Sequence, residues 1–99
     1  MRIARVIGHV VATVRSPHMQ MDKLCLVELV NKQGQSNDDT YIAMDQLGAG
    51  VGEWVMVVAG SSARRAYGQG QPQDNSPVDL CIVGIIDEVN VAGEQCYLK

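Results

Sequence analysis

The stretch RIARVIGHVVATV, residues 2–14, alternates its side chains with the two-residue period of a β-strand. Val6 and Val10 share one side of this strand with small residues, which suits the crowded interior of a small β-barrel. Ile7 and Val11 share the other side. A sheet built from this stretch would therefore carry apolar residues on both of its faces.

Further strands are predicted along the rest of the chain. The strand-like runs cover residues 23–30, 40–44, 53–59, 78–89 and 95–98. The first stretch is long for one strand, so we expect a bend or bulge at Gly8. Polar tracts at 31–39 and 60–77 are interpreted as loops, and no segment of ten or more residues shows a helical repeat that does not also fit a strand. We predict an all-β fold, a small five- to six-stranded OB-like β-barrel with little helix, in which residues 1–99 form a single domain.

The runs at 53–59 and 78–89 also carry apolar side chains on both faces. A barrel of this size has one interior, so the outer apolar residues would leave a patch of the kind that marks an interaction surface. With little helix to cover this patch, the predicted cover is another copy of the chain. We therefore expect a closed homo-oligomer and assign Ile7 and Val11 to the subunit contact.

The composition argues against several classes of partner. The 99-residue chain has a formal net charge of −3, one Trp, three Tyr and no Phe, which disfavours binding to nucleic acid. No segment approaches the roughly 20 uninterrupted apolar residues of a membrane helix. Cys25, Cys81 and Cys96 are odd in number and form no C-x-x-C pair, so we expect free thiols in a cytoplasmic protein.

Two loops rich in small residues flank the run at 53–59. The first, GAGVG at 48–52, has the spacing G-x-G-x-G and precedes a strand, whereas a dinucleotide site needs G-x-G-x-x-G before a helix. The second, GSSAR at 60–64, offers Ser61 and Ser62 as nucleophiles but lacks a G-x-S-x-G elbow. Tight turns are the favoured interpretation of both loops, and we predict no catalytic residue and no bound cofactor.

The remaining polar residues give no stronger site. His9 and His18 have no cluster of further ligands at metal spacing, so we predict no metal site. Arg64 and Arg65 form a weak basic spot. These arginines could pair with an acidic residue across a subunit contact or line an opening for an anionic metabolite, and we favour the first role.

Taken in order, five segments resemble one family. They are V-I-G-x-V-V-A-T (6–13), K-L-x-L-V (23–27), D-x-x-G-A-G-x-G-E-x-V (45–55), G-S-S-A-R (60–64) and P-V-D-x-x-I-V-G-I-I-D-x-V (77–89). The chain is similar over nearly its whole length to the EutN/CcmL/PduN family of bacterial microcompartment vertex proteins. Asp22 departs from this pattern, because the family often has a glycine there.

The resemblance implies a structural shell protein of a bacterial microcompartment. It implies a barrel that assembles into a pentamer, has hexameric shell proteins as partners and caps the corners of a polyhedral shell in the cytoplasm. The two small-residue loops would then lie at a subunit contact or near the symmetry axis, and the residues implied there are Gly48, Ala49, Gly50, Gly52, Ser61, Ser62 and Arg64. The alternatives are an OB-type module that binds a small ligand or nucleic acid, and an enzyme that uses Ser61 or Ser62.

Overall fold

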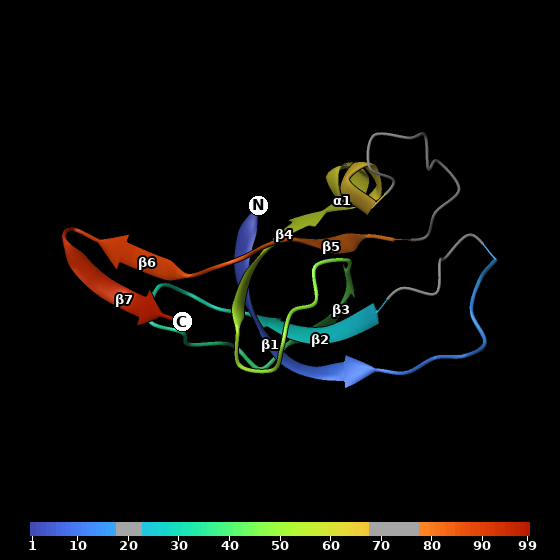
Figure 1. The fold of residues 1–99 in the computed structure, drawn as a ribbon, viewed down its shortest axis with the longest axis horizontal. Helices are drawn as coiled ribbons and strands as arrows, with labels where there is room; N and C mark the ends of the chain where they lie inside the picture. The colour runs from blue at the N-terminus through green and yellow to red at the C-terminus, as the bar shows by residue number, and fades with distance from the viewer. Residues whose placement is uncertain (18–22, 68–77) are drawn as a thin grey trace.

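A computed structural model describes residues 1–17, 23–67 and 78–99 (Figure 1). His18, Asp22 and most of the predicted loop at 60–77 therefore lie outside the described residues. Five strands form a closed barrel, and they are β1 (Arg2–Val10), β2 (Lys23–Leu29), β3 (Thr40–Asp45), β4 (Trp54–Ala59) and β5 (Leu80–Ile85). Their order around the barrel is β1-β2-β3-β5-β4, and the pairing is antiparallel except between β3 and β5. The all-β barrel fold predicted from the sequence is confirmed.

Small and β-branched side chains fill the inside of the barrel. The buried residues of this cluster are Ala4, Val6, Cys25, Val27, Ala43, Ala49, Val55, Val57 and Ile82. Most of them alternate along the strands, as expected for one face of a pleated sheet. Their small volume allows five strands to close around a filled core.

A bulge changes the phase of alternation in β1. Val6 pairs with Val27 of β2 but Gly8 pairs with Leu26, so Ile7 is an extra residue without a partner on β2. The predicted irregularity at Gly8 is confirmed. The prediction that Val10 accompanies Val6 inside the barrel is wrong, because the extra residue moves the side chains that follow it to the opposite face. The prediction that Ile7 and Val11 share one strand face is wrong for the same reason, and Val11 lies beyond the end of β1 at Val10.

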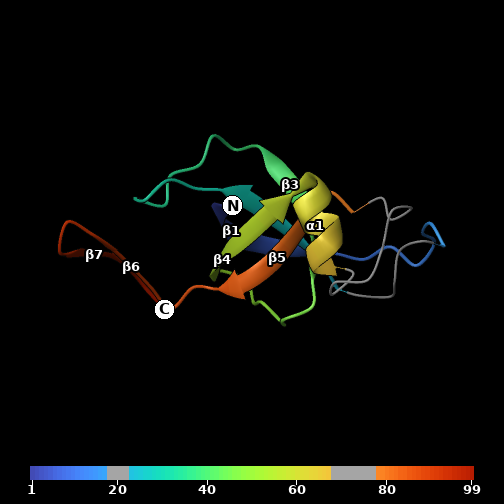
Figure 2. The same cartoon turned by 90° about the horizontal axis from the view of Figure 1, so that it is seen from above.

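A second apolar cluster lies outside the barrel, under the helix α1 (Gly60–Tyr67). It contains the buried side chains of Leu24, Met44, Ala63, Tyr67, Val78 and Cys81, with Val10 and Val58 packed against it. Figure 2 shows α1 lying across β4 and β5. The prediction of a loop over the whole of 60–77 is therefore wrong at its start, and part of the outer apolar surface is covered by the chain itself.

The local sequence explains this short helix. Ala63 and Tyr67 are four residues apart and both are buried, which places them on the same helix face. Ala and Arg are strong helix formers. The helix has eight residues, so it is shorter than the ten residues over which a helical repeat of apolar positions was sought in the sequence.

The end of the chain forms a β-hairpin apart from the barrel. Its strands are β6 (Glu88–Val91) and β7 (Glu94–Leu98), and both lie beyond the barrel in Figures 1 and 2. The run predicted at 78–89 is thus divided between β5 and β6. The hairpin lengthens the molecule, whose principal extents are 45 × 26 × 22 Å. No helix among the described residues is long and apolar enough to cross a membrane.

Candidate functional site

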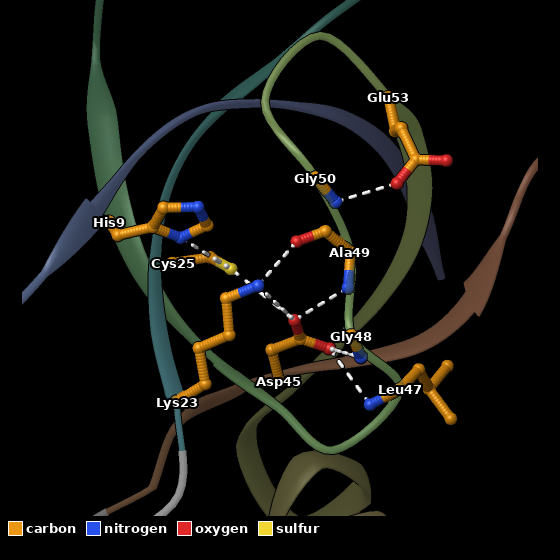
Figure 3. A network of polar contacts seen from close by, with 9 residues as sticks. All are labelled: His9, Lys23, Cys25, Asp45, Leu47, Gly48, Ala49, Gly50 and Glu53. Atoms are coloured by element: carbon orange, nitrogen blue, oxygen red, sulfur yellow. Dashed lines mark hydrogen bonds and ion pairs between the residues drawn. The ribbon is translucent and has the colours of Figure 1, made fainter.

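The loop after β3 closes one end of the barrel and is held by a buried carboxylate (Figure 3). Asp45 is 3% exposed and is the buried charged residue among those described. Its Oδ1 accepts hydrogen bonds from the backbone N–H of Leu47 at 2.9 Å and of Gly48 at 3.1 Å, and its Oδ2 accepts one from Ala49 at 2.8 Å. Three amide donors that a turn leaves unpaired are thereby satisfied inside the protein.

The side chain of Ala49 fills this end of the barrel. It is fully buried in the interior cluster. Gly48 precedes it with a φ of 84°, a left-handed conformation that a residue with a Cβ adopts at a cost. The small residues of GAG therefore let the loop turn back into the barrel, and they do not form a phosphate cradle in this arrangement.

Two strand residues complete the network around Asp45. The Lys23 ammonium donates to the carbonyl oxygen of Ala49 at 2.7 Å, and its Nζ lies 3.8 Å from Asp45 Oδ2. Cys25 Sγ lies 3.6 Å from the same carboxylate oxygen and 3.7 Å from His9 Nδ1. Burial, followed by the nearby Asp45 carboxylate, raises the pKa of the Cys25 thiol to about 11. Cys25 is therefore a protonated thiol at neutral pH and a poor nucleophile.

The far side of the same loop is bound to the hairpin. Glu53 Oε1 accepts a hydrogen bond from the Gly50 N–H at 2.6 Å. Glu53 Oε2 forms an ion pair with Lys99 Nζ at 2.9 Å. The Lys99 contact, with the Gly50 hydrogen bond, lowers the pKa of Glu53, and Glu53 in turn raises the pKa of Lys99. The loop thus joins the plugged barrel end to the last residue of the chain.

An aromatic pair holds the base of the hairpin. The rings of Trp54 and Tyr97 stack with centroids 4.3 Å apart and 16° between their planes, and the Tyr97 hydroxyl accepts a hydrogen bond from the Trp54 N–H at 3.2 Å. Gly34 packs closely against the Trp54 indole. A Cβ added at Gly34 would come within 2.9 Å of Trp54 Cζ2. These two aromatic rings are occupied by each other and do not form a platform for bases.

The predicted contact residues differ in how far they are exposed. Val11 is 88% exposed and Ile7 is 37% exposed, so both present apolar surface outside the barrel. Gly48, Gly52, Ser61 and Ser62 are also exposed, while Gly50 and Arg64 are partly buried. Ala49 differs from the rest, since its side chain is enclosed within its own chain.

Further exposed apolar residues were not singled out from the sequence. They include Met1, Tyr41, Ile42, Leu47, Val51, Met56 and Leu98. Met56 belongs to the run at 53–59, whose two apolar faces were noted, and that pattern was the signal for it. Among the described residues no group of three or more His, Cys, Asp and Glu side chains could hold a metal ion.

Comparison with known proteins identifies the family. The model of the family described as ethanolamine utilisation protein EutN/carboxysome matches residues 1–87. The chain belongs to the EutN/CcmL family. It is 44% identical over 99 residues to the bacterial microcompartment shell vertex protein EutN of Escherichia coli K12, with all of both chains covered.

Other members of the EutN/CcmL family extend the likeness. The carboxysome shell vertex protein CcmL of Synechocystis is 42% identical over all of this chain and 95% of its own length. The GrpN pentameric microcompartment shell protein from Rhodospirillum rubrum has a TM-score of 0.78 at 34% identity, covering 93% of this chain and 99% of its own. The curated relatives are named as shell vertex proteins, which confirms the predicted family and the predicted non-enzymatic role.

Proposed function

We propose that this chain is a structural protein of a bacterial microcompartment shell and forms pentamers that cap the vertices of the shell. The observation that carries the proposal is the full-length match to EutN, a shell vertex protein, whose solved structure has the same fold as this chain. The pentameric GrpN neighbour supports five as the number of subunits.

The role of such a pentamer is geometric. A flat layer of hexameric tiles cannot close on itself, and positions of five-fold symmetry turn the layer into a container. We propose hexameric shell proteins as the partners and the shell, within the cytoplasm, as the location. No covalent chemistry is required, in keeping with the protonated Cys25 thiol and the fully hydrogen-bonded Asp45.

We further propose that Ile7 and Val11 contribute to the subunit contact. Both lie outside the barrel core, and an exposed apolar side chain gains free energy when a neighbouring copy removes it from water. The small-residue loops, with Gly48, Gly52, Ser61 and Ser62 exposed, are proposed to lie at a contact or near the five-fold axis.

Native mass spectrometry of the purified chain tests this function, and a species of five chains is expected. Co-expression with hexameric shell proteins should give closed polyhedra by electron microscopy, and open sheets or tubes when this chain is omitted. A protein that stays monomeric at micromolar concentration and leaves shell closure unchanged would refute the proposal.

A pair of variants tests the contact at Ile7. Ile7→Asp should yield smaller species with the circular dichroism of the folded barrel, because burying an unpaired charge costs several kcal/mol. Ile7→Val is the matched control and should remain pentameric. If Ile7→Asp assembles as the parent does, the first strand is not in the interface.

A further inference from the structure

The polar and ring contacts described between the β6–β7 hairpin and its own barrel lie near its base. At that end Tyr97 stacks on Trp54, Lys99 pairs with Glu53, and the Ile86 N–H donates to the Trp54 carbonyl at 2.9 Å. The rest of the two strands extends away from the barrel (Figures 1 and 2). A two-stranded sheet alone is marginally stable in water. We therefore expect the projecting part to pack against a partner surface.

One face of the hairpin continues outward from the stacked tyrosine as an apolar strip. Val89 pairs with Tyr97 across the hairpin, and Val91 follows two residues later on the same face. Tyr97 stacks on Trp54, whereas Val91 is the last residue of β6, next to the turn, and is half-buried. Glu94 pairs with Val91 and places a carboxylate at the outer end of the strip.

The barrel carries a hollow with the complementary character. Its lining combines apolar side chains from β1, β2 and β4 with one cation, and consists of Met1, Arg2, Ile3, Leu29, Val30 and Met56. Ile3 and Met56 are paired neighbours on adjacent strands. Met56 lies across Gly84, where its methyl group would collide with any Cβ.

The hollow and the hairpin are two different surfaces of the chain. The hollow lies beside the point where the hairpin leaves the barrel, because Ile3 pairs with Met56 and Met56 pairs with Gly84, one residue before β5 ends. Two different surfaces that match each other produce a head-to-tail contact, which closes into a ring when the rotation between copies allows it. An isologous dimer would instead require one surface that matches itself.

We propose that the β6–β7 hairpin of one copy lies in this hollow on the next copy around the ring, with Val91 against Met56 and Glu94 near Arg2. The proposal rests on the proposed function and specifies its partner surface as a second copy of this chain. Opposite charges at the edge set the register and orientation, while the apolar strip supplies the buried area.

Apolar substitutions give the first test. Val91→Asp and Met56→Asp should each lower the association constant of the ring at least about 100-fold, because each would bury an unpaired carboxylate. Leu98→Ser and Met56→Leu are the controls. Leu98 is 66% exposed and pairs with Glu88, away from the strip, so its loss should leave the ring intact.

Charge exchange gives the second test and guards against misfolding. Arg2→Glu and Glu94→Arg should each weaken assembly, and the double variant should restore it, because the exchanged charges attract across the contact. Sedimentation velocity gives the size of each species, and far-UV circular dichroism reports whether the barrel is retained.

Several outcomes would overturn the inference. A pentameric Val91→Asp protein, or a double charge variant no better than either single variant, would show that the hairpin does not face this hollow. Hairpin variants that stay pentameric but no longer bind hexameric shell proteins would show that the hairpin contacts a hexameric shell protein instead of the next copy. If the parent chain forms no ring at all, the proposed function itself fails.

Discussion

Replacing Asp45 by Asn should loosen the loop that plugs the barrel. The substitution keeps the size of the side chain but exchanges one acceptor oxygen for an amino group. Oδ1 can still accept the Leu47 and Gly48 amides, at 2.9 and 3.1 Å. The new amino group would face the Ala49 N–H and the Lys23 ammonium, which are both donors.

The size of the effect follows from these contacts. The hydrogen bond from Ala49 to a charged acceptor is lost, which costs about 1.5–3 kcal/mol. The two remaining bonds lose their charge assistance, which we take as roughly 0.5–1 kcal/mol each. The free energy of unfolding should therefore fall by about 2.5–5 kcal/mol. For a chain of this length the midpoint of thermal unfolding should fall by at least about 10 °C.

Urea and thermal unfolding at one chain concentration measure this change, since assembly makes stability depend on concentration. Asp39→Asn is the matched control, because Asp39 lies in an exposed loop and should change stability by no more than about 0.5 kcal/mol. Amide hydrogen exchange at Leu47, Gly48 and Ala49 should accelerate only in the Asp45 variant. If both variants are equally stable, the carboxylate does not hold the loop.

Three further predictions concern the same end of the molecule. Gly48→Val should cost more than the roughly 1 kcal/mol of an ordinary glycine replacement, because φ is 84° there, and an unchanged melting temperature would contradict this. A thiol reagent such as iodoacetamide should leave Cys25 unmodified at pH 7, because its pKa is raised to about 11, while the exposed Cys96 reacts in the dissociated chain; mass spectrometry of peptides decides this, and rapid labelling of Cys25 would refute it. The Glu53–Lys99 pair should strengthen the barrel–hairpin contact above the ordinary pKa of Glu53, because the pKa of Glu53 is lowered on folding and that of Lys99 is raised. Its contribution should disappear as the pH falls through the lowered pKa of Glu53 or rises through the raised pKa of Lys99, and pH titration of Glu53→Gln, followed by Trp fluorescence, should lack the acid transition of the parent.

The barrel could be predicted from the sequence because strand alternation is a local property. Residues 2–14 and 53–59 carry their period within a few neighbouring residues, and small residues on one face indicate a narrow interior. The helix over 60–67 could not be found in the same way. Its helical face consists of two buried residues, Ala63 and Tyr67, and that face has meaning only above the outer side of β4 and β5.

The tight turn at 48–52 was predicted, but Asp45 was not singled out as the group that holds it. The order D-x-x-G-A-G marks a turn after Asp45, and an Asp that accepts amides two and three residues ahead is a common turn device. The third amide belongs to Ala49, later in the loop. Lys23 and Cys25 contact the carboxylate from another strand, β2. Only the closed barrel brings these groups to one point.

The sequence by itself determined the strand-rich fold, the excess of apolar surface and the family, since each of these is written in residue type and spacing. The tertiary structure decided which apolar residues remain outside. Ile7 inserts an extra residue into β1 and turns Val10 toward α1, and the break after Ile85 releases the hairpin from the barrel. Both depend on pairing between strands distant in the chain, and a single residue of register moves every later side chain to the opposite face.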